Sequence, residues 1–484
     1  MANRLPVAIL HPVLFVLALI IAPAVQAQGW ILKKAPALPE PAGDVVRVAS
    51  ASELRSAVSS LVSGRTIVIE PGEYMLTATL VIDGVDSVAL RGATGNRDDV
   101  ILRGKGMLEE NYGAVPHVIS VGNCDDLLIA DLTVADAWYH DIHLAGSAGP
   151  IRPHIYNVRF LDCGEQMLKV NPGYNPTAFP DTGIVEYCRF EFADRAKHWY
   201  TNGVDVLDAA NWIVRDNEFV RIRGPEGVLA GAAVLFWHTC YNTVVERNLF
   251  YECDFGVVLG LDGGPGNSKR SPESPYDHLG GVIRNNIIFR AEPGDVGISV
   301  NHANDYKIYN NTVVLNSTFS WTIECRFSDS NGEIKNNLTD GKIVKRNDAQ
   351  AEFAGNLLNA RAEWFVNFAE ADLRLSETAQ AAIDHGVPLG EVADDFEGHQ
   401  RDEPEHLDIG ADEYGTRPVG DKFCDFSGDG RNNVADVIAF LLLARANPED
   451  PGLDRNGDGV YTVADAISLL IDIMSGECRA ATGI

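Results

Sequence analysis

Two acidic loops near the end of the 484-residue chain have the residue spacing of calcium sites. Each places oxygen-bearing side chains at positions 1, 3, 5, 9 and 12 of a twelve-residue loop, with glycine at position 6. Ca²⁺ prefers about six to eight oxygen ligands in a flexible cage. We therefore expect two Ca²⁺ ions, one held by Asp425, Ser427, Asp429, the carbonyl of Arg431, Asn433 and Asp436, and one by Asp454, Asn456, Asp458, the carbonyl of Val460, Thr462 and Asp465.

The residues around the loops narrow the type of module. An apolar helix is expected after each loop, at 437–443 and 466–474, but no entering helix is visible and position 12 is Asp rather than Glu. In these features residues 416–484 resemble the dockerin family. The resemblance implies calcium-dependent folding and docking onto a cohesin-type protein. The partner-selecting positions of that family are Val-Ala in both halves, at 434–435 and 463–464, which would allow two related docking modes. Alternatively, these residues only pack the helices, or the module is a stabilising calcium fold without a partner.

A motif of asparagine followed by apolar residues recurs through the middle of the chain, at intervals of about 19 to 38 residues. One β-branched strand per unit with polar turns predicts a stacked solenoid. Asparagine stacked at one turn can bond the backbone of neighbouring coils and tolerates the left-handed conformation. The motifs begin at Asp131, Asn157, Tyr187, Asn217, Asn248, Asn286, Asn311, Asn337 and Asn356.

The strand before each turn exposes alternate residues, which stack into columns about 4.8 Å apart along such a solenoid. Aligning these strands by their inward apolar residues predicts one column of His143, Lys169, Asp205, Leu235, Ser299 and Glu324, and a second of Asn171, Trp237, Asn301 and Arg326. Asp208, His238 and His302 fall at strand ends. This mixture of cations, carboxylates, amides and an aromatic ring suits a sugar-binding groove.

Two reactions are compatible with these columns. Elimination from a uronic acid chain needs a base at the sugar C5 and a cation, or Ca²⁺, at its carboxylate. Lys169, His238 and His302 are the candidate bases, and Arg326 or a further Ca²⁺ in the groove could neutralise the carboxylate. Hydrolysis instead needs two carboxylates, for which Asp205 and Asp208 are candidates. We therefore expect catalysis from Lys169, Asp205, His238, His302 and Arg326, and substrate binding by His143, Asn171, Trp237 and Asn301.

Residues 45–415 as a whole resemble the pectate-lyase-like superfamily. They open with a helix at Ser50 to Leu61, capped by Ser50 or Ser52, and close with the segment Asp408 to Gly415. The resemblance implies an all-β, right-handed parallel β-helix, followed here by the small α-helical calcium module. It also implies a polysaccharide substrate and a lyase or glycoside hydrolase activity. A non-catalytic glycan-binding or surface-structural protein is the alternative. The long excursion at 260–278 is expected to form a groove wall or to be a tolerated surface insertion.

The remaining features concern the compartment. Residues 1–27 have the charged start, apolar run and small-residue end of a secretory signal, and 28–44 form a Pro- and Ala-rich linker. We expect a secreted protein, attached to a cell surface if the module finds a partner, with no membrane span in the mature chain. The net charge of −29 argues against nucleic-acid binding. Of eight cysteines, most recur beside apolar residues and are expected to be buried thiols, and Cys424 and Cys478 are the candidate disulfide.

Overall fold

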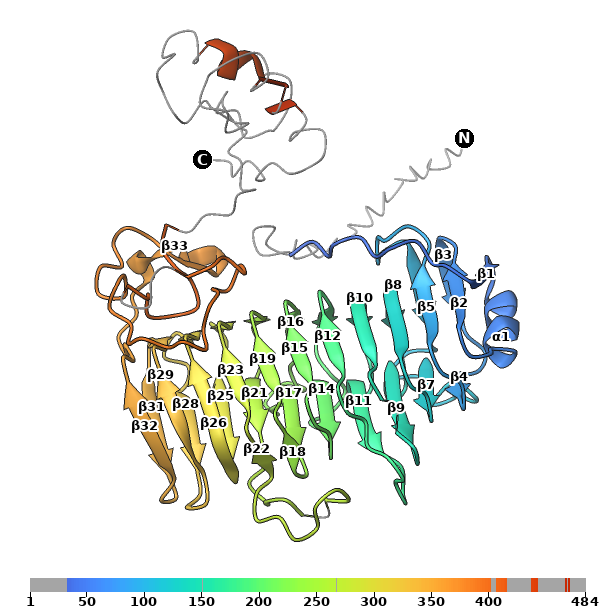
Figure 1. Ribbon diagram of the computed structural model, residues 1–484, viewed down its shortest axis with the longest axis horizontal. Helices are drawn as coiled ribbons and strands as arrows, with labels where there is room; N and C mark the ends of the chain where they lie inside the picture. Colours follow the sequence, from blue (N-terminus) through green and yellow to red (C-terminus); the bar gives the residue numbers. More distant parts are fainter. Residues whose placement is uncertain are drawn as a thin grey trace, which may run out of the picture.

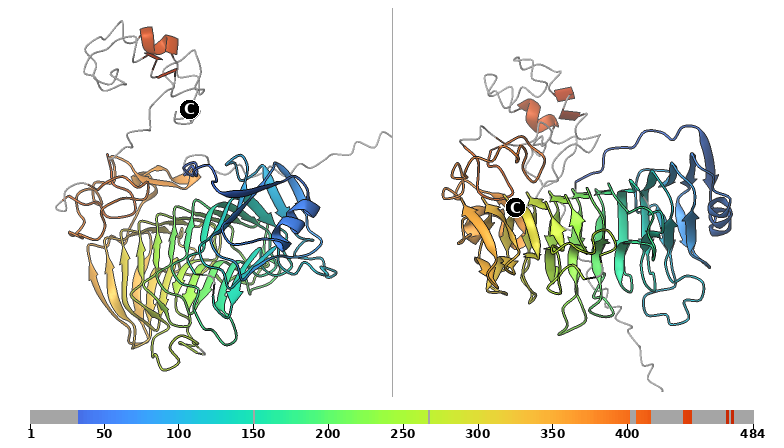
Figure 2. Two further views of the ribbon diagram at one scale, coloured as in Figure 1. Left: turned by 45° about the vertical axis from the view of Figure 1, so that its right-hand side comes forward. Right: turned by 60° about the horizontal axis from the view of Figure 1, so that its bottom comes forward.

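The computed structural model describes residues 33–149, 151–266, 268–401, 406–415, 437–442, 466–467 and 469–470. The chain winds into a long stack of coils in which equivalent strands of successive coils lie side by side (Figures 1 and 2). Every pairing between strands of the stack is parallel, and the antiparallel strands β33 and β34 lie outside the stack. The predicted parallel β-helix is therefore confirmed.

One face of the stack is a sheet that contains ten strands within the described residues. Its outward side chains form the columns predicted from the sequence, so it positions the candidate site. In spatial order the strands are β4 (Leu80–Asp83), β7 (Ile119–Gly122), β9 (Ile142–Gly146), β11 (Gln166–Pro172), β14 (Asn202–Leu207), β17 (Ala232–Trp237), β21 (Phe255–Leu259), β25 (Ile298–Asn301), β28 (Trp321–Arg326) and β31 (Lys342–Arg346).

A second, larger sheet forms the other two faces, because a bend divides most of its coils into two strands. The strands before the bend are β1 (Asp44–Val48), β2 (Arg65–Ile69), β5 (Val88–Gly92), β12 (Ile184–Glu186), β15 (Ile213–Arg215), β19 (Val244–Glu246), β23 (Val282–Arg284), β26 (Ala303–Tyr309), β29 (Asn331–Lys335) and β32 (Gln350–Ala354). Those after it are β3 (Gly72–Met75), β6 (Val100–Arg103), β13 (Arg189–Glu191), β16 (Glu218–Val220), β20 (Leu249–Tyr251), β24 (Ile287–Phe289), β27 (Thr312–Val314) and β30 (Leu338–Thr339). β8 (Leu127–Ala135) and β10 (His154–Leu161) run through the bend, and the short strands β18 (Cys240–Tyr241) and β22 (His278–Leu279) extend one edge.

An asparagine ladder runs along this bend. The backbone N–H of each ladder residue donates to the amide oxygen of the next one along the stack, at 3.0 Å. Each Nδ2 from Asn217 to Asn337 also donates to the next amide oxygen and to a backbone carbonyl of the preceding coil. The predicted stacking is thus confirmed for Asn217, Asn248, Asn286, Asn311, Asn337 and Asn356.

The first motifs, however, were aligned one residue too early. Register places Asn157 and Tyr187 beside Asp216, the residue before the ladder, and Cys188 beside Asn217. The residue before the ladder is the one in the left-handed conformation, with φ between 49° and 56° at Asn157, Tyr187, Asp216, Arg247, Asn285, Asn310 and Asn336. The two roles expected of a single asparagine, amide bonding and left-handed backbone, therefore belong to adjacent positions.

The interior is filled by stacked apolar side chains. Phe160, Phe190, Phe219 and Phe250 form a ladder of rings with centroids 4.3, 4.7 and 4.9 Å apart and planes 7° from parallel. The cysteines of the described residues are buried and unpaired, as predicted for Cys163, Cys188, Cys240, Cys253 and Cys325. Cys424 and Cys478 lie outside the described residues.

Helix α1 (Ala51–Ser59) covers the N-terminal end of the stack, with Leu54, Ala57 and Val58 buried. Ser50 rather than Ser52 is its N-cap: Oγ accepts from Glu53 N at 3.3 Å, and Glu53 in turn accepts from Ala49 N at 2.8 Å. This reciprocal capping box satisfies two donors of the first turn, and therefore fixes where the helix begins.

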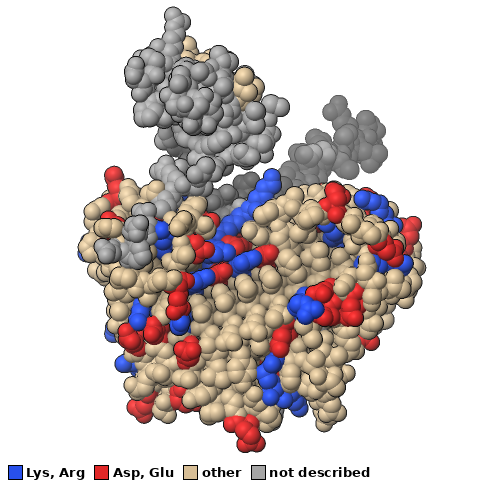
Figure 3. All heavy atoms as spheres, in the orientation of Figure 1, with Lys and Arg blue, Asp and Glu red and all other residues tan. Residues whose placement is uncertain are grey.

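The segments flanking the stack lie along the bent sheet rather than only at its ends. η1 (Ala362–Trp364), β33 (Phe365–Asn367), η2 (Phe368–Glu370) and β34 (Asp372–Leu375) form an apolar cluster with outer side chains of β20, β24, β27 and β30. On the other side, Lys33 pairs with Asp216 at 2.6 Å and also bonds the carbonyl of Phe396. Figure 3 shows short rows of acidic and basic side chains on this face. On the neighbouring strands β23 and β19, Arg284 pairs with Glu246 at 2.7 Å.

Candidate functional site

The outward columns of the ten-stranded sheet are those expected from the sequence. Register aligns His143 with Lys169, Lys169 with Asp205, and Asp205 with Leu235. Ser299 pairs with Glu324, and Asn301 with Arg326, on β25 and β28. Val258 on β21 completes the first column, and Arg346 on β31 extends the second.

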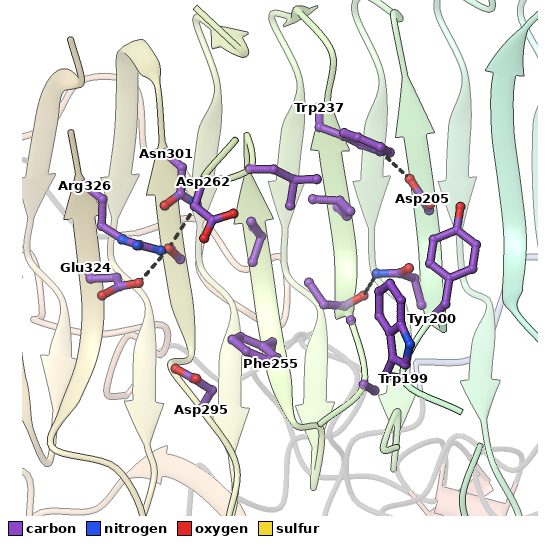
Figure 4. A pocket seen from close by; sticks show the side chains of 18 of the residues that line it. Trp199, Tyr200, Asp205, Trp237, Phe255, Asp262, Asp295, Asn301, Glu324 and Arg326 are labelled. Carbon is purple, nitrogen blue, oxygen red and sulfur yellow. Dashed lines mark hydrogen bonds between the residues drawn. The ribbon is translucent and has the colours of Figure 1, made fainter. Parts of the chain in front are cut away.

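These columns form the floor of a groove of about 540 Å³. Its middle is apolar, because Ala232, Leu235 and Val258 cluster there with Phe255 and Leu261 packed against them. Polar side chains gather at the two ends (Figure 4). The other residues of the lining are Trp199, Tyr200, Asn202, Asp205, Ala230, Gly231, Trp237, Asp262, Asp295, Ser299, Asn301, Phe319, Trp321, Glu324, Arg326 and Arg346.

The N-terminal end of the groove is built on a buried ion pair. Lys169 Nζ lies 2.5 Å from Asp205 Oδ2, and both side chains are at most 9% exposed. The other oxygen of Asp205 accepts from Trp237 Nε1 at 2.7 Å. The lysine ammonium also lies 5.8 Å from the Trp237 ring and 5.9 Å from the Tyr200 ring. Both oxygens of Asp205 are thus occupied, and Lys169 itself is not part of the groove lining.

Beyond this pair, a cluster of histidines continues the sheet past the groove. His143 Nε2 donates to Asn171 Oδ1 at 2.9 Å, so two of the predicted substrate-binding residues bind each other. The His143 ring lies 4.9 Å from that of His117 and 5.1 Å from that of His140. Burial lowers the pKa of all three imidazoles, to about 4 for His117. These histidines are therefore neutral near pH 7.

The C-terminal end of the groove is organised around Glu324. Its Oε1 accepts from Ser299 Oγ at 3.0 Å, and its Oε2 accepts from Trp321 Nε1 at 3.0 Å and from Arg346 at 2.6 Å. Asp295 lies below it in Figure 4 and lines the same groove. Burial, aided by the charge of Glu324, raises the pKa of Asp295. The carboxylates at this end therefore differ: one is fixed by hydrogen bonds, and the other binds its proton more tightly than usual.

Two polar groups at this end lack partners among the described residues. Asn301 is 4% exposed, and its Oδ1 accepts no hydrogen bond, although Nδ2 donates to the carbonyl of Gly260 at 3.1 Å. Arg326 Nε is also unpartnered, and the guanidinium packs 4.9 Å from the Phe327 ring. Unpaired buried polar atoms are costly. Their position in a groove marks them as groups that a bound molecule would satisfy.

The insertion at 260–278 forms part of the groove wall, as one of the two interpretations of the sequence held, since Leu261 and Asp262 line the groove. Asp277, near the end of the insertion, holds the start of the insertion in place. Its carboxylate accepts from Leu261 N at 2.7 Å and from His238 N, after β17, at 2.6 Å. Asp208 accepts from Ser268 Oγ at 2.7 Å and from the backbone N–H groups of Lys269 and Arg270. Burial raises the pKa of Asp277 to about 6. Asp208, a candidate carboxylate for hydrolysis, is thus occupied in holding the wall.

Two predicted bases lie outside the groove lining. His238 and His302 follow β17 and β25 in left-handed turns, with φ of 55° and 47°. His238 packs 4.0 Å from the Trp237 ring, while His302 donates to Asp329 at 2.8 Å and stacks 4.0 Å from Phe327. The predicted set is therefore divided: Asp205, Trp237, Asn301 and Arg326 line the groove, and Lys169, His143, Asn171, His238 and His302 do not.

Distance along the sheet also separates Lys169 from Arg326. Their strands β11 and β28 are five positions apart in the sheet, or about 24 Å at the usual strand spacing. A base and a cation this far apart cannot act on the same sugar unit.

Several groove residues escaped prediction. Trp199 and Tyr200 lie in the loop before β14, and Asp262 was expected only as part of the insertion. Asp295 lies in a turn before β25. Arg346 lies on β31, a strand that the sequence alignment did not include. The regular spacing to β28 could have revealed the strand that carries Arg346.

The predicted calcium ligands, from Asp425 to Asp465, lie outside the described residues. Within the described ranges, no group of three or more His, Cys, Asp and Glu side chains is arranged to hold a metal ion. Residues 437–442, 466–467 and 469–470 are helical, in the two positions where helices were expected. No helix of the described chain is long and apolar enough to cross a membrane.

Comparison with known proteins defines the fold class. No protein-family model and no curated protein matches the sequence. Among solved structures, pectate lyase Pel9A matches with a TM-score of 0.52 and 13% identity, over 77% of this chain and 96% of that one. An alginate lyase from Paenibacillus sp. str. FPU-7 (TM-score 0.39, 13% identity, 66% and 99% covered) and PfbA, a surface adhesin of Streptococcus pneumoniae (0.39, 13%, 63% and 88%), also match. The chain therefore has a pectate-lyase-like parallel β-helix fold.

Proposed function

We propose that this protein is a carbohydrate-degrading enzyme that cleaves a polysaccharide lying in the groove of the ten-stranded sheet. The observation that supports this most is the groove itself, with an apolar floor between two polar ends. Sugar rings present apolar faces and hydroxylated edges, and therefore suit aromatic and aliphatic surfaces flanked by polar groups.

The dimensions and rim of the groove favour a polymer. From β14 to β28 the sheet advances four strands, or about 19 Å. Trp199 is 65% exposed and Tyr200 38% exposed at one end, where they offer stacking surfaces. Phe319 and Trp321 line the other end. A chain of several sugar units could therefore contact aromatic rings at both ends.

The experiment is a screen of soluble polysaccharides, neutral and acidic, with the purified protein. Reducing-end release and ultraviolet absorbance of unsaturated products are recorded together, so that hydrolysis and elimination are both detected. Any cleavage that weakens in the Arg326→Leu variant, at the C-terminal end of the groove, supports the proposal. Binding without cleavage of every polymer tested would instead support the alternative, a non-catalytic glycan-binding or surface-structural protein.

We also propose, from the sequence alone, that the enzyme is secreted and attached through its calcium module. The support is the signal-like segment 1–27 and the paired loops at 425–436 and 454–465. Close carboxylates repel one another without a cation, so helix content in 416–484 should fall in EGTA and return with Ca²⁺. Circular dichroism of the full chain, with an Asp425→Ala/Asp454→Ala variant as control, tests this. An equal EGTA response in both proteins would contradict it.

A further inference from the structure

We propose that the cleavage centre lies at the C-terminal end of the groove, around Asp262, Asp295 and Glu324, and that it hydrolyses an uncharged polysaccharide. This inference rests on the proposed function and extends it to a substrate class, a reaction and the residues that perform it. None of these three carboxylates belongs to the catalytic set expected from the sequence.

The charge of the groove argues for an uncharged substrate. Asp205 is neutralised by Lys169, and Glu324 by Arg346. The lining then leaves Asp262 and Asp295 against the single cation Arg326. The whole chain carries a net charge of −29. A polyanion would thus meet no excess of positive charge in the groove, and the protein would repel it at long range.

The substrate class restricts the reaction. Elimination requires a carboxyl group at the sugar C5, because that group makes the neighbouring C–H acidic. An uncharged sugar lacks it, so its glycosidic bond is broken by hydrolysis. Hydrolysis commonly uses a protonated carboxyl group on one side of the bond and an ionised carboxylate on the other.

The C-terminal end supplies both kinds of carboxyl group. Asp295 is half-buried near Glu324, and its raised pKa favours the protonated acid. Asp262 is exposed on the insertion and lies on the opposite side of Glu324 in Figure 4. Its exposure lets a water molecule reach its carboxyl group. The environments of the two aspartates therefore suit opposite roles in proton transfer.

Unsatisfied polar atoms point independently to a ligand at this end. Asn301 Oδ1 has no donor among the described residues, although the side chain is 96% buried in the groove floor. A sugar hydroxyl could donate to it. The guanidinium of Arg326 has no hydrogen-bond or ion-pair partner among the described residues, and its N–H groups could donate to a ring or hydroxyl oxygen. At the Lys169 end, by contrast, the same types of group are paired with each other.

Asp295 gives its proton to the glycosidic oxygen while the bond from that oxygen to the anomeric carbon breaks. A water oxygen adds to the anomeric carbon from the opposite face, and Asp262 takes the proton that this water loses. The carboxylate of Glu324, held by Ser299, Trp321 and Arg346, stabilises the positive charge at the anomeric carbon. Solvent then returns a proton to Asp295 and removes one from Asp262.

The experiment compares the full-length protein with Asp295→Asn, Asp262→Asn and, as a matched control, Glu273→Gln, which changes an exposed charge in the same insertion. Uncharged and uronate polymers are assayed for reducing ends and for unsaturated products. We expect reducing ends from an uncharged polymer without unsaturated product. Each aspartate variant should lose at least about 100-fold in kcat, with little change in KM, while the control stays active.

A pH profile separates catalysis from structural damage. Wild-type kcat should fall as the pH rises through the pKa of Asp295, which burial and Glu324 raise and which the Val296 N–H, Arg290 and Arg346 lower. The residual activity of Asp295→Asn should lack this fall. Unsaturated products from a uronate polymer would overturn the inference and leave the proposed function intact. Full activity of either aspartate variant would overturn the residue assignment, and no cleavage of any polymer would overturn both proposals.

Discussion

The two ends of the groove use similar residues in opposite ways. At the N-terminal end, Lys169, Asp205 and Trp237 bond one another, and no polar atom of the three is left unpaired among the described residues. At the C-terminal end, Glu324 is equally well bonded, but Arg326 and Asn301 next to it keep unpaired atoms. A charged column on a sheet can therefore be structural at one end and open to a ligand at the other.

The difference between the two ends shows that residue type alone does not identify a catalytic group. A lysine in a groove suggests a base, yet a lysine at 2.5 Å from a buried carboxylate is committed to its partner. An arginine without a carboxylate partner is more informative, because burial without pairing costs free energy that a ligand can recover. Substitutions at the N-terminal end of the groove should therefore affect mainly stability. Substitutions at the C-terminal end should affect mainly activity.

The largest effect on stability is expected at Lys169. Lys169→Met leaves Asp205 as an uncompensated buried charge, which should lower the free energy of unfolding by about 3–5 kcal/mol. Lys169→Met combined with Asp205→Asn should recover most of the loss, since neither charge remains. Denaturant unfolding measures both. A Lys169→Met variant as stable as the wild type would contradict a structural role for this ion pair.

The groove wall should respond to pH through Asp277. Its folded pKa of about 6 lies above the ordinary 3.8, so its contribution to stability is complete below about pH 4 and is lost as the pH rises through 6. The loss should reach about 2–3 kcal/mol by pH 7. Other buried carboxyls titrate in this range too, including Asp408 with a pKa of about 7. Asp277→Asn should therefore make the decline in stability with pH shallower by Asp277's share, and an unchanged slope would contradict the assignment.

A smaller effect, on substrate affinity, is expected at Arg326. Arg326→Leu removes donors that line the groove and breaks no ion pair among the described residues, so KM should rise about tenfold. The free energy of unfolding should change by less than about 0.5 kcal/mol. Steady-state kinetics and unfolding on the same preparation test this. Lost stability with unchanged KM would assign Arg326 to structure instead.

The smallest effect is expected at His238. It follows β17 in a turn, packs on Trp237 and does not line the groove. His238→Asn keeps a residue that tolerates the left-handed turn, and kcat should stay within about threefold of the wild type. A tenfold or larger loss would restore histidine as a candidate base.

The sequence predicted the fold and the columns because both depend on short periodicities. Alternation along each strand placed Lys169 beside Asp205 and Ser299 beside Glu324 correctly. The ladder was misaligned at Asn157, because asparagine suits both the left-handed position and the bonded position beside it. Tyr187 was misaligned with it, because the two residues lie beside each other on neighbouring coils.

The catalytic assignments needed information that the sequence lacks. Lys169 and Arg326 share a face, but the number of strands between them becomes clear only when β21 is counted. Asp262 and Asp295 come from an insertion and a turn, whose paths have no repeat. Whether a polar atom is paired also depends on rotamers across neighbouring coils, as the unpaired Oδ1 of Asn301 illustrates.

The most direct test of the account measures cleavage of one uncharged polysaccharide by two variants side by side. Lys169→Met/Asp205→Asn removes the charges of the N-terminal end but keeps an amide oxygen for Trp237, and Asp295→Asn removes the acid of the C-terminal end. The double variant should keep kcat within about threefold of the wild type, and Asp295→Asn should lose at least about 100-fold. Loss of cleavage in the double variant, with full kcat in Asp295→Asn, would contradict it.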